Sequence, residues 1–363
     1  MISMKIRTIA TVAVTILFVC MSAAPTWAAG SQVLDRELQS EKIANSKIGS
    51  GPLRKMVVYL PPGYEGSSKR YPVIYFAANA FESYRSLFDQ DNARDLFDAA
   101  SKSGTIREFI LVSPDLTTPV GGSWCVNSPA TGNWEDFVVQ ELVPYMDANF
   151  RTLPRRESRG IAGDRLGGYC AIRLAMRHPE IFGSLYALHP VGTGSGLQIM
   201  YSRPNWDLMA KAKSIDDLKG DVFSMIFLSI FQAHVPDADK PPLFVDLPAR
   251  KEDGQLVVDS KLTERLHNSF FLERMIPQYA DNLKSLRGFK FDWGRNDLNQ
   301  DHVYANQAFT HKLDEFGVPH EAEEYRGVFG DRNWGEDGRV YTEVLPFFGR
   351  HLVFEEGGSG AGK

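Results

Sequence analysis

Cysteine is scarce in this sequence of 363 residues, which contains three. Only Cys125 and Cys170 lie outside the apolar N-terminus, so a disulfide-rich scaffold is excluded and an apolar core must hold the fold together. The chain also lacks a block of lysine and arginine, and its formal net charge is −5. We therefore expect no nucleic-acid partner. The eight histidines show no spacing typical of a metal site, and no cofactor motif is present, so we expect neither a metal nor a cofactor.

The longest apolar run lies at the N-terminus. Residues 1–7 carry Lys5 and Arg7, residues 8–24 are almost wholly apolar, and the small residues of "PTWAAG" follow. This pattern predicts a signal peptide over residues 1–28 and a secreted or periplasmic protein with no membrane span after cleavage. A membrane anchor is the alternative, although the run is at the short end for spanning a bilayer. In an oxidising compartment Cys125 and Cys170 could form a disulfide, the alternative being two buried free thiols.

The rest of the chain alternates strand and helix patterns. Residues 29–50 are polar, and we expect them to be a frayed N-terminal segment. Residues 51–354 contain the apolar strand-like runs "YPVIYFAA", "EFILVSP", "SRGIAG", "FGSLYALHP" and "FKFDWG", which alternate with amphipathic helical patterns. This order predicts one α/β domain with a mostly parallel central sheet and helices on both faces. Residues 196–287 are too long for a plain loop and predict an inserted cap, and residues 355–363 predict a flexible tail.

The stretch "SRGIAGDRLGGYCAIRLAMRHPE" (158–180) has the pattern of a strand, a sharp turn and a helix. In serine hydrolases this turn carries the nucleophilic serine at its apex. Here the apex residue is Arg165. A guanidinium is always protonated in proteins and has no lone pair with which to attack an acyl carbon.

Four segments carry a family resemblance: "VVYLPPGYEGSSKRYPVIYF", "TGNWEDFVVQELVPYMDANFRTLPRRESRGIAG", "GGYCAIRLAMRHPEIFGSLYALHP" and "EFGVPHEAEEYRG". They resemble the putative esterase family of the α/β-hydrolase fold, which includes esterase D, feruloyl and acetyl-xylan esterases and the mycolyltransferase antigen 85 proteins. The resemblance runs from about residue 57 to the end of the chain. It implies an α/β-hydrolase fold, whereas activity has to be judged from the site residues.

Two of the three side chains that the resemblance implies for catalysis are replaced. The family's aspartate corresponds to Asp297 in "FDWGRND", which is intact, whereas Arg165 stands in place of the serine. The family's histidine follows the last strand, but this chain has no histidine between positions 320 and 351. Phe329, Asp331 or Arg332 takes its place, and none of them is a base near neutral pH in the way histidine is. The degenerate triad positions are therefore Arg165, Asp297 and Phe329, and activity as a serine hydrolase is expected to be absent.

Arg165 needs a partner for its charge. An ion pair with Asp297, or else with Asp331, would make it a structural residue; otherwise Arg165 would bind an anionic ligand at the start of the following helix. The candidate ligand-binding residues are Arg165, Leu166 (through its backbone N–H), Asn79, Trp124, His189, Asp297 and Asp331. For His189 a purely structural role is the alternative.

These observations leave three functions open. The first is a secreted esterase-like pseudoenzyme that binds an anionic, acyl or carbohydrate ligand, or a cell-envelope protein, in the former active-site cleft. The second is an active carboxylic-ester hydrolase with a rearranged site, in which Asp164 or another residue is the nucleophile and His189 or His302 is the base. The third is a structural or protein-interaction module.

Overall fold

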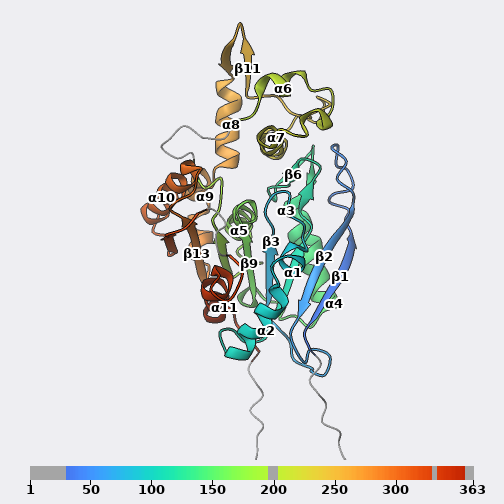
Figure 1. The fold of residues 1–363 in the computed structure, drawn as a ribbon, viewed down its shortest axis with the longest axis vertical. Coiled ribbons are helices and arrows are strands. Elements are labelled where there is room, and N and C mark those ends of the chain that lie inside the picture. Colours follow the sequence, from blue (N-terminus) through green and yellow to red (C-terminus); the bar gives the residue numbers. More distant parts are fainter. Residues whose placement is uncertain (1–29, 195–202, 329–332, 356–363) are drawn as a thin grey trace, which may run out of the picture.

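The computed structural model describes residues 30–194, 203–328 and 333–355, and an eight-stranded sheet forms its centre (Figure 1). The predicted signal peptide, residues 356–363 of the predicted tail, and the positions of Phe329, Asp331 and Arg332 lie outside the described residues. Pairing is parallel from β4 to β14 and antiparallel at β1 and β2, so the mostly parallel sheet that the sequence predicts is confirmed. In spatial order the strands are β1 (Gln32–Gln39), β2 (Leu53–Leu60), β4 (Ile110–Pro114), β3 (Val73–Ala77), β9 (Arg159–Asp164), β10 (Ser184–Leu188), β13 (Gly288–Gly294) and β14 (Glu321–Tyr325).

Helices cover both faces of this sheet because its central strands are apolar on both sides. Along β3, Ile74 and Phe76 belong to one buried cluster and Val73 and Tyr75 to the other. The first cluster includes residues of α2 (Ala93–Ser103) and α11 (Leu345–His351). The second includes residues of α4 (Val143–Asn149), α5 (Leu166–Arg177), α9 (Leu272–Lys284) and α10 (Gln300–Glu315). No helix in the described ranges is long and apolar enough to cross a membrane.

The N-terminal segment differs from the sequence-based expectation. Residues 32–39 are not frayed but form β1, which pairs with β2 along its whole length. The strand is polar because it is the edge of the sheet, with Val33, Leu34 and Leu38 packed against the core. Its backbone pairing, which composition does not reveal, holds it in place.

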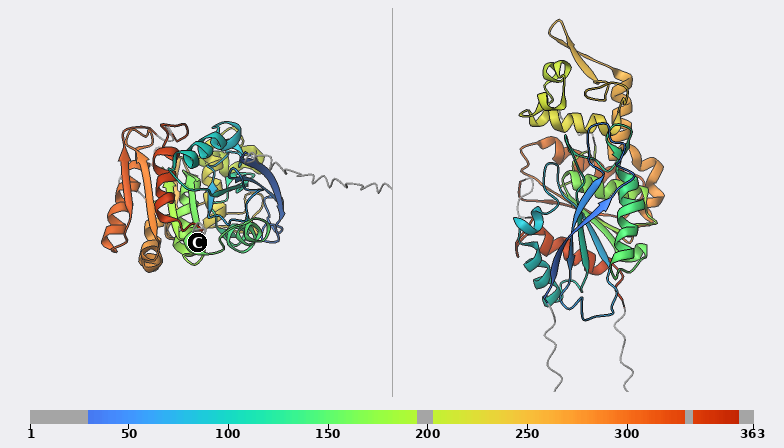
Figure 2. Two further views of the ribbon diagram at one scale, coloured as in Figure 1. Left: turned by 90° about the horizontal axis from the view of Figure 1, so that it is seen from below. Right: turned by 90° about the vertical axis from the view of Figure 1, so that its right-hand side faces the viewer.

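The insertion after β10 stands above the carboxyl ends of the central strands (Figures 1 and 2). Its described elements are α6 (Trp206–Lys211), a 3₁₀ turn (Ile215–Leu218), α7 (Val222–His234), the hairpin β11 (Ala249–Glu252) and β12 (Gln255–Val258), and α8 (Ser260–Phe270). We call this part of the chain, residues 203–271, the cap. Helix α9 follows the cap and packs beside the sheet against α5, where Arg177 Nη1 donates to Tyr279 Oη at 2.6 Å and Asn282 Nδ2 to the carbonyl of Met176 at 3.0 Å.

Short elements complete the described chain. They are α1 (Ser86–Asp89), α3 (Trp134–Asp136), a π-helical segment (Phe137–Leu142) that continues into α4, a 3₁₀ turn (Arg156–Ser158), a second π-helical segment (Val340–Val344) before α11, and the two-residue strands β5 (Thr117–Thr118), β6 (Gly121–Gly122), β7 (Asn127–Ser128) and β8 (Gly132–Asn133).

Candidate functional site

The sharp turn between β9 and α5 holds Arg165 in a strained backbone conformation, with φ 54° and ψ −105°. Such a conformation is uncommon for a residue with a side chain and persists only where the surroundings enforce it. The surroundings here include two glycines. A Cβ on Gly167 would lie 1.9 Å from the carbonyl oxygen of Ala77, and a Cβ on Gly163 would lie 2.3 Å from the carbonyl carbon of Gly167. The chain therefore keeps the geometry of a nucleophile elbow while presenting a guanidinium.

Arg165 lies against two carboxylates near its own turn. Its Nε is 3.1 Å from Asp164 Oδ2 and its Nη1 is 3.6 Å from Glu82 Oε1. The expected ion pair with Asp297 is therefore wrong, because Asp297 is held by two histidines instead. Asp164 is buried beneath the apex, as expected for the residue one position before it. Burial raises the pKa of Asp164 to about 7, although the charge of Arg165 opposes the rise.

Asp297 is buried and accepts hydrogen bonds from three directions. Its Oδ2 lies 3.0 Å from His189 Nε2 and 2.8 Å from His302 Nδ1, and its Oδ1 accepts the backbone N–H of Asn299 at 2.8 Å. Burial alone would raise the pKa of Asp297, but the hydrogen bonds from the two histidines outweigh it and hold this pKa below its ordinary value. Asp297 is thus a stable carboxylate that can orient an imidazole.

A cavity of about 450 Å³ opens between the carboxyl ends of the strands and the cap. Its lining is mainly apolar and includes seven aromatic side chains: Phe81, Trp124, Phe223, Phe227, Phe231, Phe270 and Phe271. Most of the polar lining residues come from outside the cap, among them Asn79, Arg165, Asp297, Asn299 and His302, whereas His267 belongs to cap helix α8. An aromatic cavity with a few converging polar groups is the usual form of a small-molecule site.

The structure brings most of the sequence-derived candidates to this cavity. Asn79, Trp124, Arg165, Leu166 and Asp297 all line it. His189 is not among the lining residues; it is buried behind Asp297, where it holds the carboxylate. Asp331 lies outside the described residues. Nothing in the sequence indicated Glu82, which the loop after β3 brings to Arg165, or the phenylalanines of α7 and α8, which reach the cavity only when the cap is folded.

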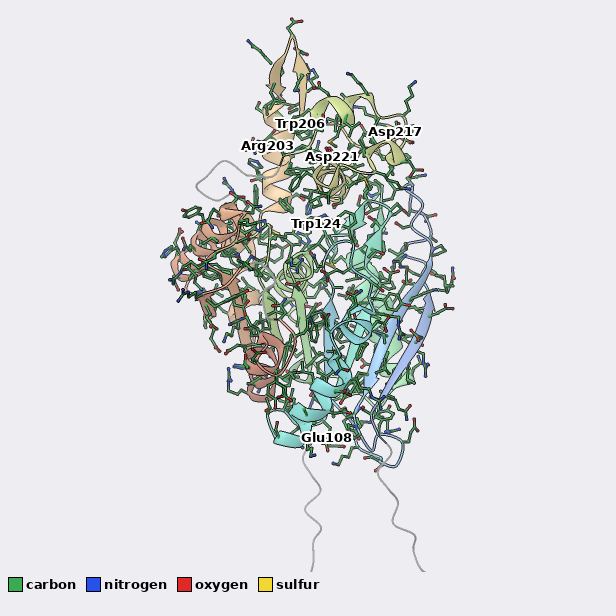
Figure 3. The ribbon with its side chains drawn as sticks, viewed as in Figure 1. Glu108, Trp124, Arg203, Trp206, Asp217 and Asp221 are labelled. Atoms are coloured by element: carbon green, nitrogen blue, oxygen red, sulfur yellow. A yellow bond between two sulfur atoms is a disulfide. The ribbon has the colours of Figure 1, made fainter. Side chains whose placement is uncertain are left out.

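Trp124 connects the cap to the sheet (Figure 3). It is buried, and its Nε1 donates to Ser229 Oγ of α7 at 2.9 Å. Its ring meets those of Tyr169 and Phe270 edge to face, with centroids 5.2 and 5.1 Å away. Trp124 therefore holds α7, α8 and the elbow helix together, in addition to lining the cavity.

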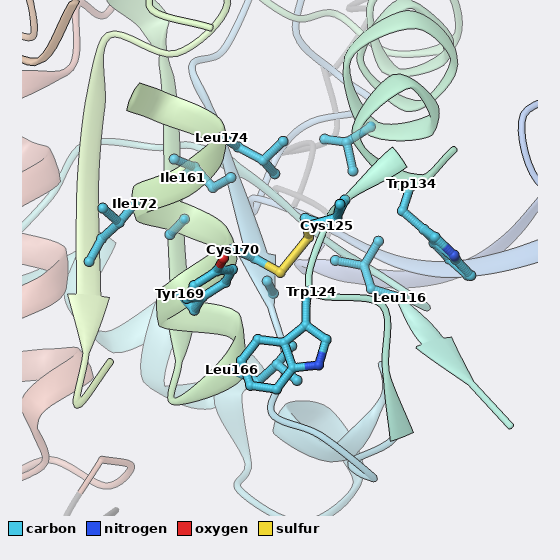
Figure 4. Close-up of a cluster of buried hydrophobic side chains, with 14 of the residues drawn as sticks. Leu116, Trp124, Cys125, Trp134, Ile161, Leu166, Tyr169, Cys170, Ile172 and Leu174 are labelled. Carbon is cyan, nitrogen blue, oxygen red and sulfur yellow. A yellow bond between two sulfur atoms is a disulfide. The ribbon is translucent and has the colours of Figure 1, made fainter. Parts of the chain in front are cut away.

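Cys125 and Cys170 form a disulfide, with Cα atoms 5.5 Å apart (Figure 4). The bond ties the loop that carries Trp124 to the second turn of α5. In Figure 4 the Trp124 ring lies beside Leu166, the first residue of that helix. The disulfide thus stabilises one wall of the cavity.

His189, Asp297 and His302 have ligand atoms within 4.8 Å of one another, a spacing that a metal ion could in principle use. The hydrogen bonds of His189 do not fit this use. Its Nδ1 accepts the backbone N–H of Gly294 at 3.0 Å, so the single proton of the neutral ring is on Nε2, which faces Asp297. Burial lowers the pKa of His189, which favours this neutral form. A nitrogen that carries a proton cannot bind a metal.

Comparison with known proteins agrees with this architecture. Residues 51–220 match the family model described as "Putative esterase". The chain is 27% identical over 311 residues to a protein named as an esterase from Mycobacterium tuberculosis strain H37Rv; the match covers 82% of this chain but 58% of that relative's length.

Among solved structures, a ferulic acid esterase superposes with a TM-score of 0.62 at 20% identity, covering 89% of this chain and all of that one. An S-formylglutathione hydrolase from Staphylococcus aureus superposes with a TM-score of 0.55 at 13% identity, covering 87% and 100%. At these identities the superpositions show a shared fold. These findings give the chain the α/β-hydrolase fold and relate residues 51–220, just under half of its length, to the putative esterase family.

Proposed function

We propose that this protein is a non-catalytic esterase-like binding protein that holds the acidic head of an apolar ligand against Arg165. The observation that carries the proposal is the position of Arg165, at the apex of an intact elbow and on the wall of an aromatic cavity. The cavity that holds the acyl group in a serine hydrolase would then bind a ligand without forming an acyl-enzyme.

Loss of the nucleophile supports the absence of serine chemistry. Arg165 cannot form an acyl intermediate because its guanidinium is not nucleophilic. No histidine lies between positions 320 and 351, where the family carries its base. A serine hydrolase that loses its nucleophile retains only the small rate that binding and oxyanion stabilisation supply.

The charges around Arg165 favour a carboxylate as the ligand head. Of the two carboxylates that the described residues place beside Arg165, Glu82 is held more weakly than Asp164, because it is 3.6 Å away and its side chain is 39% exposed. A ligand carboxylate could replace Glu82 and bind two guanidinium N–H groups at once, beside the amino end of α5. The phenylalanines of the cavity would bury the apolar part of the ligand at about 25 cal/mol per Å².

We also propose that the protein is secreted or periplasmic. The basic and apolar pattern of residues 1–28 supports export. A disulfide persists in the oxidising compartments that exported proteins reach, which agrees with Cys125–Cys170.

The first test is ester hydrolysis by the purified protein. Acetyl, butyryl and feruloyl esters would be offered to the wild type and to an Arg165→Ser, Phe329→His double variant. The proposal expects the wild type to match the uncatalysed rate. Turnover well above that rate, abolished by a single substitution in the cavity, would favour the rearranged hydrolase and contradict the proposal.

The second test is ligand-dependent thermal stability. Ferulate and decanoate would be compared with their primary amides, which keep the apolar body and lose the charge. A carboxylate at 100 times its Kd should stabilise the native state by about 2.7 kcal/mol. Arg165→Ala should abolish this shift, and Arg295→Ala, which removes a largely exposed arginine elsewhere, should not. Equal shifts with acids and amides would exclude Arg165 as the binding group, and no shift with any probe would favour an interaction module.

A further inference from the structure

The cavity contains a second feature that carboxylate binding does not require, the pair Asp297 and His302. His302 lies in the first turn of α10, five positions after Asp297, and its Nδ1 is 2.8 Å from Asp297 Oδ2. In a serine hydrolase the aspartate contacts the same ring nitrogen, and this contact leaves Nε2 as the base. The family resemblance places the catalytic histidine after the last strand, whereas His302 belongs to α10.

The two histidines on Asp297 differ in which nitrogen holds a lone pair. His189 uses both nitrogens internally, accepting from Gly294 through Nδ1 and donating to Asp297 through Nε2. His302 donates to Asp297 through Nδ1, so in the neutral ring Nε2 is an acceptor. Nε2 lies 3.0 Å from the side-chain nitrogen of Asn299, which donates to it. His302 can therefore accept a proton, whereas His189 cannot.

The location of His302 makes this lone pair relevant to the site. His302, Asn299, Arg165 and Leu166 all line the same cavity. Asn299 is the side chain that Nε2 faces, so this edge of the ring is on the cavity side. The side chain of His302 is 20% exposed, whereas that of His189 is 1% exposed.

We propose that His302, oriented by Asp297, is a proton acceptor of this cavity, so that the chain has lost the nucleophile of its family but not a base. The base has moved from the loop after β14 to the start of α10. In the wild-type protein Nε2 accepts the hydrogen of a hydroxyl group on a molecule in the cavity, once that group replaces the amide of Asn299.

This arrangement predicts the chemistry of an Arg165→Ser variant. The introduced hydroxyl oxygen would attack the acyl carbon of an ester while its proton passes to His302 Nε2. The backbone N–H of Leu166 would donate to the oxyanion. When the tetrahedral species collapses, the bond to the alcohol oxygen breaks and His302 returns the proton to it. Water then hydrolyses the acyl-enzyme by the same route, which regenerates the serine.

The test compares Arg165→Ser with Arg165→Ala on p-nitrophenyl acetate, with Phe329 unchanged in both. General base catalysis contributes roughly 10² to 10⁴-fold, so Arg165→Ser should exceed Arg165→Ala by about 100-fold or more. It should also acquire labelling by a fluorophosphonate probe. Adding His302→Gln should return the rate to that of Arg165→Ala. Adding His311→Gln, an exposed histidine on the same helix, should not.

Two results would overturn the proposal: a folded Arg165→Ser variant without any gain, or a gain that survives His302→Gln. If Arg165→Ser does not fold, ¹⁵N NMR of the wild-type imidazoles gives a second measurement. His302 should carry its proton on Nδ1 and His189 on Nε2, and the opposite assignment for His302 would refute its role. These outcomes are independent of ligand binding by the wild type, which tests the proposed function.

Discussion

Asp297→Asn is the substitution that most directly probes the polar side of the cavity. The change keeps the shape of the side chain but replaces one acceptor oxygen by an NH₂ donor. Three donors point at the wild-type carboxylate, namely His189 Nε2–H, His302 Nδ1–H and the backbone N–H of Asn299. An asparagine has one oxygen, which can face either the histidines or Asn299.

The expected loss of stability follows from the hydrogen bonds. If the oxygen faces the histidines, the NH₂ group meets the N–H of Asn299. If it faces Asn299, His302 can change tautomer, but His189 cannot because Gly294 donates to its Nδ1. Either orientation leaves one buried donor without an acceptor, which costs about 1–3 kcal/mol, and it also removes a charge-assisted pair. We expect a total loss of about 2–4 kcal/mol in the free energy of unfolding at pH 7.

The pH dependence has a definite sign. Because the pKa of Asp297 is held below its ordinary value, its charge stabilises the native state above the unfolded pKa of about 3.9. This contribution is lost as the pH falls through the lower, native-state pKa. The stability difference between the wild type and Asp297→Asn should therefore be largest near neutral pH and narrow as the pH drops below about 4.

Urea unfolding followed by circular dichroism, at pH 7 and at pH 3.5, measures this difference. Asp314→Asn provides the control, because Asp314 is an exposed carboxylate on the same helix and its replacement should change stability by less than about 0.5 kcal/mol. Equal stability of Asp297→Asn and the wild type at pH 7 would refute the reasoning. So would a difference that grows on acidification.

Three further predictions concern the elbow and its supports. Gly167→Ala should lower the free energy of unfolding by more than about 4 kcal/mol or prevent folding, because the added Cβ would meet the carbonyl oxygen of Ala77. Gly51→Ala, where a Cβ would point into open space, should be close to neutral. A stable Gly167→Ala protein would contradict the elbow geometry. Asp164→Asn should remove a decline in stability that the wild type shows between about pH 4 and 7, because over this range the carboxyl ionises in the unfolded chain while its raised native pKa of about 7 keeps it protonated in the folded state. Parallel urea-derived stability profiles for the two proteins would count against this. Replacing Cys125 and Cys170 by alanine should lower the free energy of unfolding by about 4 kcal/mol, because the disulfide closes a loop with a separation of 45 residues and so restricts the unfolded chain. Urea unfolding against the oxidised wild type measures this loss. An unchanged midpoint would show that the bond does not constrain the unfolded chain.

The local pattern of the sequence was enough to predict the elbow and most of the sheet. Gly163, Arg165 and Gly167 follow a continuous apolar strand, and this spacing specifies the sharp turn because only glycine tolerates the close backbone contacts on either side. The central strands could be found because they are apolar on both faces. Strand β1 could not, since its hydrogen bonds to β2 depend on a partner that lies elsewhere in the chain.

The identity of Arg165 by itself determined that the side chain at the apex of the elbow is not a nucleophile, because no fold gives a guanidinium a free lone pair. What surrounds Arg165 was decided by tertiary structure. An arginine has several carboxylates within reach of its long side chain, and sequence cannot rank Asp164, Glu82 and Asp297 as partners. In the folded chain Asp297 accepts hydrogen bonds from His189 and His302 and is therefore not the ion-pair partner of Arg165. The aromatic cavity likewise exists only because the cap folds back over the carboxyl ends of the strands, bringing together residues far apart in the chain.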